Sequence, residues 1–341
     1  MLTDRQRMIL NVIIDDYIRS AEPIGSRSIS KRSDVSFSPA TIRNEMADLE
    51  ELGFLEQPHT SAGRIPSIKG YRYYVDHLVR LNEINEHEMQ TVRSFFTEKM
   101  NQMEQIIQHA AMILSNMTNY TSIVLGPETF TTSLKHFQLV PLSEDTAVAI
   151  IVTNTGHVEN RTISLPDDMN MEEMLQAVQI LNAKLIGVPF ARLKSKLYSE
   201  VGQELGRYAD QCERLLGVLN DALKSENDHR VFMSGTTNML TQPEFKDVDK
   251  VKTLLDLLDE TPTIMQMFNA LPSGIGVRIG TENTHEAINN CSLITATYSI
   301  EGKSLGTIGI LGPTRMDYGK VISLLDVLSK DMSVLLGRWY K

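Results

Sequence analysis

The chain has 341 residues, a length that predicts two or three domains, and its 42% hydrophobic and 22% charged residues are typical of a globular protein with a sizeable core. A net charge of −10 argues against a protein that coats nucleic acid without selectivity. The charge is uneven, because residues 1–80 are neutral overall and the remainder carries the whole acidic excess. A neutral N-terminal region is compatible with local, selective DNA binding.

The two cysteines, Cys212 and Cys291, support neither a disulfide framework nor a four-ligand zinc site, because they lie far apart in the sequence. The N-terminus lacks the apolar stretch of a signal peptide. The longest apolar run, residues 147–152, is far too short to span a bilayer. We therefore expect a cytoplasmic protein with no metal, no cofactor and no membrane contact.

Three helices are predicted within the first fifty residues. Thr3 and Gln6 form a capping-box pattern, so the first helix should begin here and extend to about Ser20. Ser26 can cap a second, short helix over residues 27–32. Three helices with a tight connection between the last two are typical of a helix-turn-helix, although a plain three-helix bundle without a ligand has the same spacing.

The third helix has marked ends. Ser38 is a good N-cap and Pro39 fits the first helical position, where no N–H is needed. Gly53 can end the helix in a left-handed turn. Apolar residues recur at i, i+4 and i+7 and predict one buried stripe: Ile42, Met46 and Leu49.

The outer face of this helix is unusual. Ala40, Arg43, Asn44 and Ala47 point away from the apolar stripe, and Thr41 lies on its flank. Small residues allow close approach of the backbone, and arginine and asparagine are suited to reading base edges. The acidic residues come later in the helix. This pattern predicts a recognition helix that enters a DNA groove by its N-terminal end.

A hairpin is predicted directly after this helix, which makes it the wing of a winged helix. Residues 53–57 read as a strand, residues 59–64 as a turn, and Ile65 starts the return. We expect Arg64, beside a flexible Gly63, to lie at the wing tip and to enter a minor groove or meet a phosphate. Basic residues collect on the two segments that would flank the recognition helix.

These residues also carry a family resemblance. The run SPATIRNEMADLEELGFL, followed by HTSAGRIPS and GYRYYVD, resembles the N-terminal domain of the HrcA family of bacterial heat-inducible transcription repressors. The later runs GVRIGTEN and YSIEGKSLGTIGILGPTRMDYGKVI are similar to that family too, so the resemblance covers nearly the whole chain. It implies a homodimeric repressor of class I heat-shock (chaperone) operons that binds an inverted repeat, the CIRCE operator. Release on heat shock and modulation by the GroE chaperonin are implied as well.

We expect the contacts with double-stranded DNA to come from the third helix, the wing and one residue of the second helix. Arg43 should prefer guanine and Asn44 adenine, and Ala40 can meet a thymine methyl group. Phosphate contacts are expected from Arg27, Ser38 and Thr41. The full predicted set is Arg27, Ser38, Pro39, Ala40, Thr41, Arg43, Asn44, His59, Thr60, Ser61, Gly63 and Arg64.

Beyond residue 80 the chain mixes helices and strands. Residues 82–88 are polar and read as a linker, and a methionine-rich amphipathic helix follows, whose stripe indicates packing rather than a cofactor site. Strands are expected over 121–125, 134–142, 146–153, 157–163, 231–233, 276–279, 292–300 and 306–311. Further helices are expected over 171–185, 190–224, 248–258 and 317–339.

The predicted fold class is α+β multidomain, with four parts. Residues 1–80 form the winged helix-turn-helix, and residues 81–118 form a linker and long helix. Residues 119–164 together with 231–341 are expected to form a GAF-like α+β domain. Residues 165–230 would be a mostly helical domain inserted into it, which the resemblance implies to be the dimerising domain.

No catalytic motif is found. The glycine-rich stretch 274–280 lies within a predicted strand and opens no helix, so it is not a dinucleotide site. Gly302-Lys303-Ser304 lacks the earlier glycine of a P-loop, and the histidines match neither a zinc-protease helix nor a Ser-His-Asp triad. An enzyme is therefore not expected. The alternative function is a ligand-sensing GAF-type regulator in which a small molecule controls DNA binding.

Overall fold

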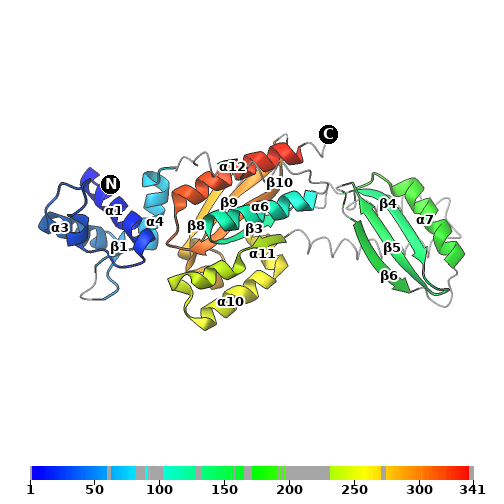
Figure 1. Ribbon diagram of the computed structural model, residues 1–341, viewed down its shortest axis with the longest axis horizontal. Helices are drawn as coiled ribbons and strands as arrows, with labels where there is room; N and C mark the ends of the chain where they lie inside the picture. Colours follow the sequence, from blue (N-terminus) through cyan, green and yellow to red (C-terminus); the bar gives the residue numbers. More distant parts are fainter. Residues whose placement is uncertain are drawn as a thin grey trace.

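The computed structural model describes residues 2–59, 63–81, 89–90, 92, 103–126, 133–154, 156, 158–164, 171–189, 193, 196, 231–269, 274–300 and 302–337. Three parts follow one another along the longest axis of the molecule: a helical head, a central layer and a smaller three-stranded unit (Figure 1). Within the described ranges, no helix is both long and apolar enough to cross a membrane.

The head contains the three predicted helices. Helix α1 spans Asp4–Ser20 and starts with the predicted capping box, in which the Thr3 hydroxyl accepts a hydrogen bond from the Gln6 backbone N–H. Helix α2 spans only Ser26–Ile29. The prediction that Ser26 caps this helix is wrong, because Ser26 is its first helical residue and is buried, and Gly25 takes the cap position without a side-chain bond. Helix α3 spans Pro39–Glu51.

The wing is a short antiparallel hairpin. Strands β1 (Leu55–Glu56) and β2 (Ile65–Pro66) pair in the register Leu55 to Pro66. On the other side, Ile24 makes a bridge with Arg64, so the segment between α1 and α2 adds a third extended piece to the wing. Helix α4 (Ile68–Tyr73) and a π-helix (Tyr74–Leu78) complete the head.

The central layer is an antiparallel five-stranded sheet in the order β7-β3-β10-β9-β8. Buried side chains of α6 and α12 pack on one face of this sheet, and those of α10 and α11 pack on the other (Figure 1). The bounds are β3 Thr121–Leu125, β7 Val231–Ser234, β8 Ile275–Ile279, β9 Cys291–Ile300, β10 Lys303–Pro313, α6 Met103–Thr118, α10 Val248–Asp259, α11 Thr261–Asn269 and α12 Tyr318–Leu336.

Short 3-10 turns connect these elements: η2 Thr236–Thr241, η3 Pro243–Phe245, η4 Gly280–Glu282 and η5 Glu286–Ile288. Helix α11 was not predicted. Its second residue is Pro262, which reads as a helix breaker but is tolerated in a first turn, where no backbone N–H is needed.

The third unit corrects one predicted boundary. Strands β4 (Leu134–Pro141), β5 (Thr146–Thr153) and β6 (Val158–Ser164) form a sheet of their own, on which helix α7 (Met171–Leu185) packs. Their assignment to the same domain as residues 231–341 is therefore wrong.

The physical reason is that both edges of β3 are occupied, by β7 and β10, while the buried side chains of β4 and β5 face α7 instead. The sheet β4–β6 and helix α7 thus lie beside the central layer (Figure 1). The GAF-like and dimerising assignments stay predictions. Of the helix expected over 190–224, only residues 193 and 196 are described, and both are helical.

Candidate nucleic-acid interface

Helix α3 is held in place by its cap and its buried stripe. The Ser38 hydroxyl accepts a hydrogen bond from the Thr41 N–H at 3.1 Å, as predicted, and Pro39 is the first helical residue. Ile42, Met46 and Leu49 are buried in the head core together with residues of α1. Gly53 adopts the expected left-handed conformation after the helix, with φ of 78°.

The opposite face of α3 is open to solvent. Ala40, Arg43, Asn44 and Ala47 are exposed, and Thr41 is half-buried with its hydroxyl 2.9 Å from the Ser38 hydroxyl. In the described part of the chain, the Arg43 and Asn44 side chains have no hydrogen-bond or ion-pair partner. The structure therefore brings together, on the outer face of the helix, two free side chains suited to base edges and two small residues.

The second half of α3 carries acidic residues, and two of them are paired with arginines from other elements. Arg5 of α1 lies 3.1 Å from the Glu45 carboxylate, and its guanidinium stacks over the Phe37 ring at 5.2 Å. Arg64 reaches Glu50 with its Nη2 at 2.6 Å. Both pairs reduce the negative charge that would oppose a phosphate backbone. Sequence reasoning missed Arg5, because its partner lies forty positions away in the chain.

Arg64 does not lie at the tip of the wing. Its backbone N–H and C=O both pair with Ile24, and its side chain, which is 20% exposed, donates from Nε to Glu50 at 2.7 Å. Gly63 is not a flexible joint either, because a Cβ at this position would come within 2.3 Å of the Ile24 carbonyl oxygen. Glycine is needed here because the two backbones approach closely.

Other basic residues near α3 also make contacts within the protein. Arg32 makes a two-pronged bond to Asp34, which lowers the pKa of that carboxyl group, and a further ion pair with Asp16. Lys69 donates to the Leu52 carbonyl at 2.7 Å. Part of the positive charge that flanks α3 is therefore used within the protein.

The remaining predicted residues are distributed as follows. Arg27 in α2 is exposed and, within the described part of the chain, unpaired, as is Lys31 just after that helix. His59 is exposed at the start of the wing turn, and Thr60 and Ser61 lie outside the described residues. The free cations described around α3 thus come from α2 and from α3 itself.

The described residues contain no group of three or more potential metal-ligating side chains of the His, Cys, Asp and Glu types. Cys291 lies inside the central layer, where burial raises the pKa of its thiol to about 12. A thiol in that state is a poor nucleophile at neutral pH.

Comparison with known proteins agrees with this interpretation of the head. A family model described as "Winged helix-turn-helix transcription repressor, HrcA DNA-binding" matches residues 1–77, and one described as "HrcA protein C terminal domain" matches residues 104–322. Two curated relatives are named heat-inducible transcription repressor HrcA. The protein from Brevibacillus brevis is 53% identical over 98% of both chains. The protein from Halalkalibacterium halodurans is 52% identical over 100% of this chain and 99% of its own.

One solved structure is similar over the full length. It is a crystal structure of a hypothetical protein, 25% identical to this chain, with a TM-score of 0.72 and coverage of 99% of this chain and 100% of the other. The arrangement of the head, the central layer and the third unit is therefore shared with a protein whose structure was determined independently.

Proposed function

Because the chain belongs to the HrcA family of heat-inducible transcription repressors, we propose that it is a dimeric repressor of chaperone operons that reads an inverted-repeat operator of the CIRCE type. The observation that carries this proposal is the free outer face of α3. Arg43 and Asn44 are exposed there without a partner in the described part of the chain, while Arg32, Arg64, Lys69 and Arg72 bind other groups of the protein. A helix-turn-helix places such a face in the major groove.

The reading mode follows from the side chains. Arg43 would donate two hydrogen bonds to guanine O6 and N7, and Asn44 would pair in the same two-pronged way with adenine N6 and N7. Ala40 would contact a thymine methyl group, and Pro39 would lie against the backbone at the point of entry. Thr41 and Arg27 would hold phosphates, and Ser38 would contribute less because its hydroxyl already caps the helix.

The role that we propose for the wing differs from the one predicted from the sequence. His59, Thr60 and Ser61 would meet the DNA backbone, since they come between β1 and β2 in the sequence. Arg64 and Gly63 would instead shape the wing, Arg64 through its bond to Glu50 and Gly63 through its close approach to Ile24. DNA contact by the wing would therefore be mostly independent of sequence.

The heat response would follow from the linkage of two heads. Two heads joined in one dimer bind one operator much more tightly than separate heads, so a loss of dimerisation on warming would release the operator. The GroE chaperonin would supply the refolding route that restores the dimer. Such a repressor would act in the cytoplasm.

The proposal is tested by a mobility-shift assay of the full chain with the inverted repeat of a chaperone operon. Unlabelled operator should compete strongly, and a scrambled repeat of the same composition should not. Binding that is equally sensitive to both competitors would contradict the proposal. A thermal-shift screen with small molecules tests the ligand-sensing alternative, because a ligand of the native state raises the melting temperature by mass action.

The heat mechanism needs its own experiment. Sedimentation and operator binding are measured on the same samples at rising temperature, before and after addition of chaperonin with ATP. The dimer should be lost in the temperature range where the operator is released, and chaperonin should restore both. Release from a dimer that stays intact would contradict this part of the proposal.

A further inference from the structure

The head meets the central layer through an aromatic contact around Tyr318, the first residue of α12. The rings of Tyr71 and Tyr74 lie with their centroids 5.9 and 6.4 Å from the Tyr318 ring. The Tyr71 hydroxyl is buried and has no hydrogen-bond partner in the described part of the chain. Ring packing of this kind holds the two parts together by apolar contact. We call this contact the pivot, and the polar bonds beside it add direction.

On one side of this pivot, an arginine of the head reaches the central layer. Arg72 of α4 donates from Nε to Glu282 at 2.8 Å and from Nη2 to both the other Glu282 oxygen and the Val277 carbonyl. The two parts approach closely beside it, since a Cβ on Gly280 would lie 2.6 Å from the Ile68 side chain. Two parallel bonds between a guanidinium and a carboxylate fix direction as well as distance.

On the other side, an arginine of the central layer reaches the head. Arg315, between β10 and α12, donates from Nη1 to the Ile18 carbonyl of α1 at 2.7 Å. Its Nε and Nη2 donate to Glu244 at 2.6 and 3.3 Å, and Nη2 also lies 3.2 Å from the Gln242 side-chain oxygen. The side chain is 11% exposed. All three nitrogens of the guanidinium are thus used, and the group is held rigidly by its own domain while it binds the other.

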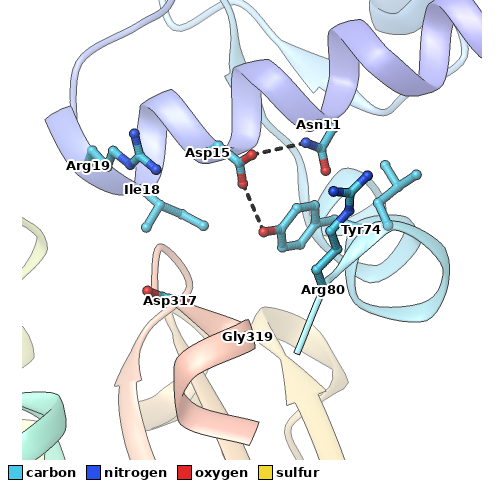
Figure 2. A pocket seen from close by; sticks show the side chains of 9 residues that line it. Asn11, Asp15, Ile18, Arg19, Tyr74, Arg80, Asp317 and Gly319 are labelled. Carbon is cyan, nitrogen blue, oxygen red and sulfur yellow. Dashed lines mark hydrogen bonds between the residues drawn. The ribbon is translucent and has the colours of Figure 1, made fainter. Parts of the chain in front are cut away.

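Next to the pivot, the packing leaves a gap. A cavity of about 240 Å³ lies between α1, the π-helix and the start of α12 (Figure 2). Asp15 on its wall accepts a hydrogen bond from the Tyr74 hydroxyl at 2.9 Å, and Asp317 and Gly319 face it from the central layer (Figure 2). Buried side chains of the head and the central layer belong to one apolar cluster, but the gap leaves part of the junction unpacked, so the polar bonds that cross it add direction to this contact.

We propose that Arg72 and Arg315 form a clamp that fixes the orientation of the head relative to the central layer, and thereby sets the half-site spacing that the dimer accepts. The clamp is defined as these two side chains with Glu282, Val277 and Ile18. It rests on the proposed function, because spacing matters only when two heads read one operator. Both arginines are positioning residues, since their bonds join the head to the central layer, whereas α3 lies at the end of the head away from that layer (Figure 1). The clamped orientation leaves the reading face of α3 uncovered.

The clamp is tested first without DNA, on the full chain. Asp48→Cys on α3 and Val334→Cys on α12 place two fluorescent labels on exposed positions of the two parts, in a Cys212→Ser background; buried Cys291 is protected from labelling. Single-molecule energy transfer should give one narrow distribution of distances between the two labels when the clamp is intact. Glu282→Arg places a second positive charge beside Arg72 and should broaden this distribution. Adding Arg72→Glu restores a pair of opposite charges and should narrow the distribution again.

The second measurement uses DNA with altered spacing. The two half-sites of the inverted repeat are moved apart in single base-pair steps through half a helical turn, about five base pairs. The wild-type protein should bind the worst spacing on the order of 100-fold more weakly than the best, because one head is then lost from the linked pair. Glu282→Arg and Arg315→Gln should reduce that ratio to about tenfold or less, since loosely held heads reach more spacings. Lys330→Glu, an exposed charge reversal on α12 away from the head, is the matched control and should change nothing.

The outcomes separate this inference from the proposed function. Unchanged distance distributions in Glu282→Arg and Arg315→Gln would overturn the clamp, whatever the DNA result. Broadened distances with an unchanged spacing profile would overturn its role in positioning. A wild-type protein that binds no inverted repeat would overturn the proposed function, while the energy-transfer measurement would still decide whether the clamp exists. Rescue of both readouts by the Arg72→Glu and Glu282→Arg pair supports the inference and shows that the single variant had not merely unfolded.

Discussion

The outer and inner ends of the head are marked by two short helices, α3 and α4 (Figure 1), and the arginine on each differs in its pairing. On α3, Arg43 is exposed and has no partner in the described part of the chain. On α4, Arg72 binds Glu282, Val277 and Asp76. Both arginines lie on helices, so their place in the secondary structure does not distinguish them. The pairing of each side chain does: an arginine with a buried or local partner serves the architecture, and one without a partner is available to a ligand.

The largest expected effect is on stability and comes from a substitution at the inner end of the head, where it meets the central layer. Tyr318 is fully buried, with its hydroxyl 2.7 Å from both the Ser292 hydroxyl and the Thr314 carbonyl. Tyr318→Ala should lower the free energy of unfolding by about 3–5 kcal/mol, as for other large-to-small changes in a core. Urea denaturation followed by circular dichroism measures this. Tyr318→Phe keeps the ring and should lose only about 1 kcal/mol, so an equal loss in both variants would show that the ring does not pack as described.

The next largest expected effect is on operator binding and comes from a substitution on α3, at the outer end of the head. Arg43→Ala should weaken operator binding by about 1–3 kcal/mol, with the loss concentrated at one base pair of each half-site, and should leave the unfolding free energy unchanged. Arg27→Ala provides the contrast, because removal of a phosphate contact should weaken binding to all sequences alike and reduce the salt dependence. Titrations of operator and scrambled DNA at several salt concentrations measure both. Equal, sequence-independent losses in the two variants would contradict base reading by Arg43.

A smaller effect concerns the N-cap of α3. Ser38→Ala removes the acceptor for the Thr41 N–H and should cost the head about 1 kcal/mol of stability. Ser36→Ala, two residues earlier at an exposed position, is the matched control and should cost almost nothing. Thermal melting of both variants compares them. A Ser38→Ala protein that is as stable as the control would show that the cap does not hold the start of the recognition helix.

The smallest effect is a pH dependence at the inner end. Burial raises the pKa of Asp15, and its bond from Tyr74 and the nearby Arg19 and Arg32 oppose this only in part. The folded state therefore holds the Asp15 proton more tightly than the unfolded state. The stability that this group contributes is present below the ordinary carboxyl pKa and is lost as the pH rises through the raised value. Asp15→Asn should remove this decline in stability between pH 4 and neutrality. The urea midpoints of both proteins, measured across that pH range, test this. Parallel pH profiles in the two proteins would contradict the prediction.

Local sequence signals were sufficient for the helices and strands of the head. The caps of α1 and α3, the buried stripe of α3 and the left-handed Gly53 all depend on residues within a few positions of one another, so they could be read directly. The exposed face of α3 follows from the same periodicity.

Long-range pairing could not be read in this way. The bonds from Arg64 to Glu50 and from Arg315 to Ile18 join residues fourteen and 297 positions apart, and neither spacing has a local signature. The separate sheet of β4–β6 was missed for a similar reason, because alternation within a strand does not tell which helix will cover it. The wing arginine was therefore expected at the tip, whereas the structure pairs its backbone with Ile24 next to β2.

The most direct test of the reading face uses operator DNA methylated at guanine N7, where the methyl group blocks a bidentate arginine contact. Wild-type and Arg43→Ala proteins are each bound to the partly methylated operator, and bound and free DNA are compared at every guanine. Entry of the first half of α3 into the major groove predicts that wild-type binding is blocked by methylation of one guanine per half-site, and that Arg43→Ala is insensitive at that guanine alone. The same interference pattern in both proteins would contradict it.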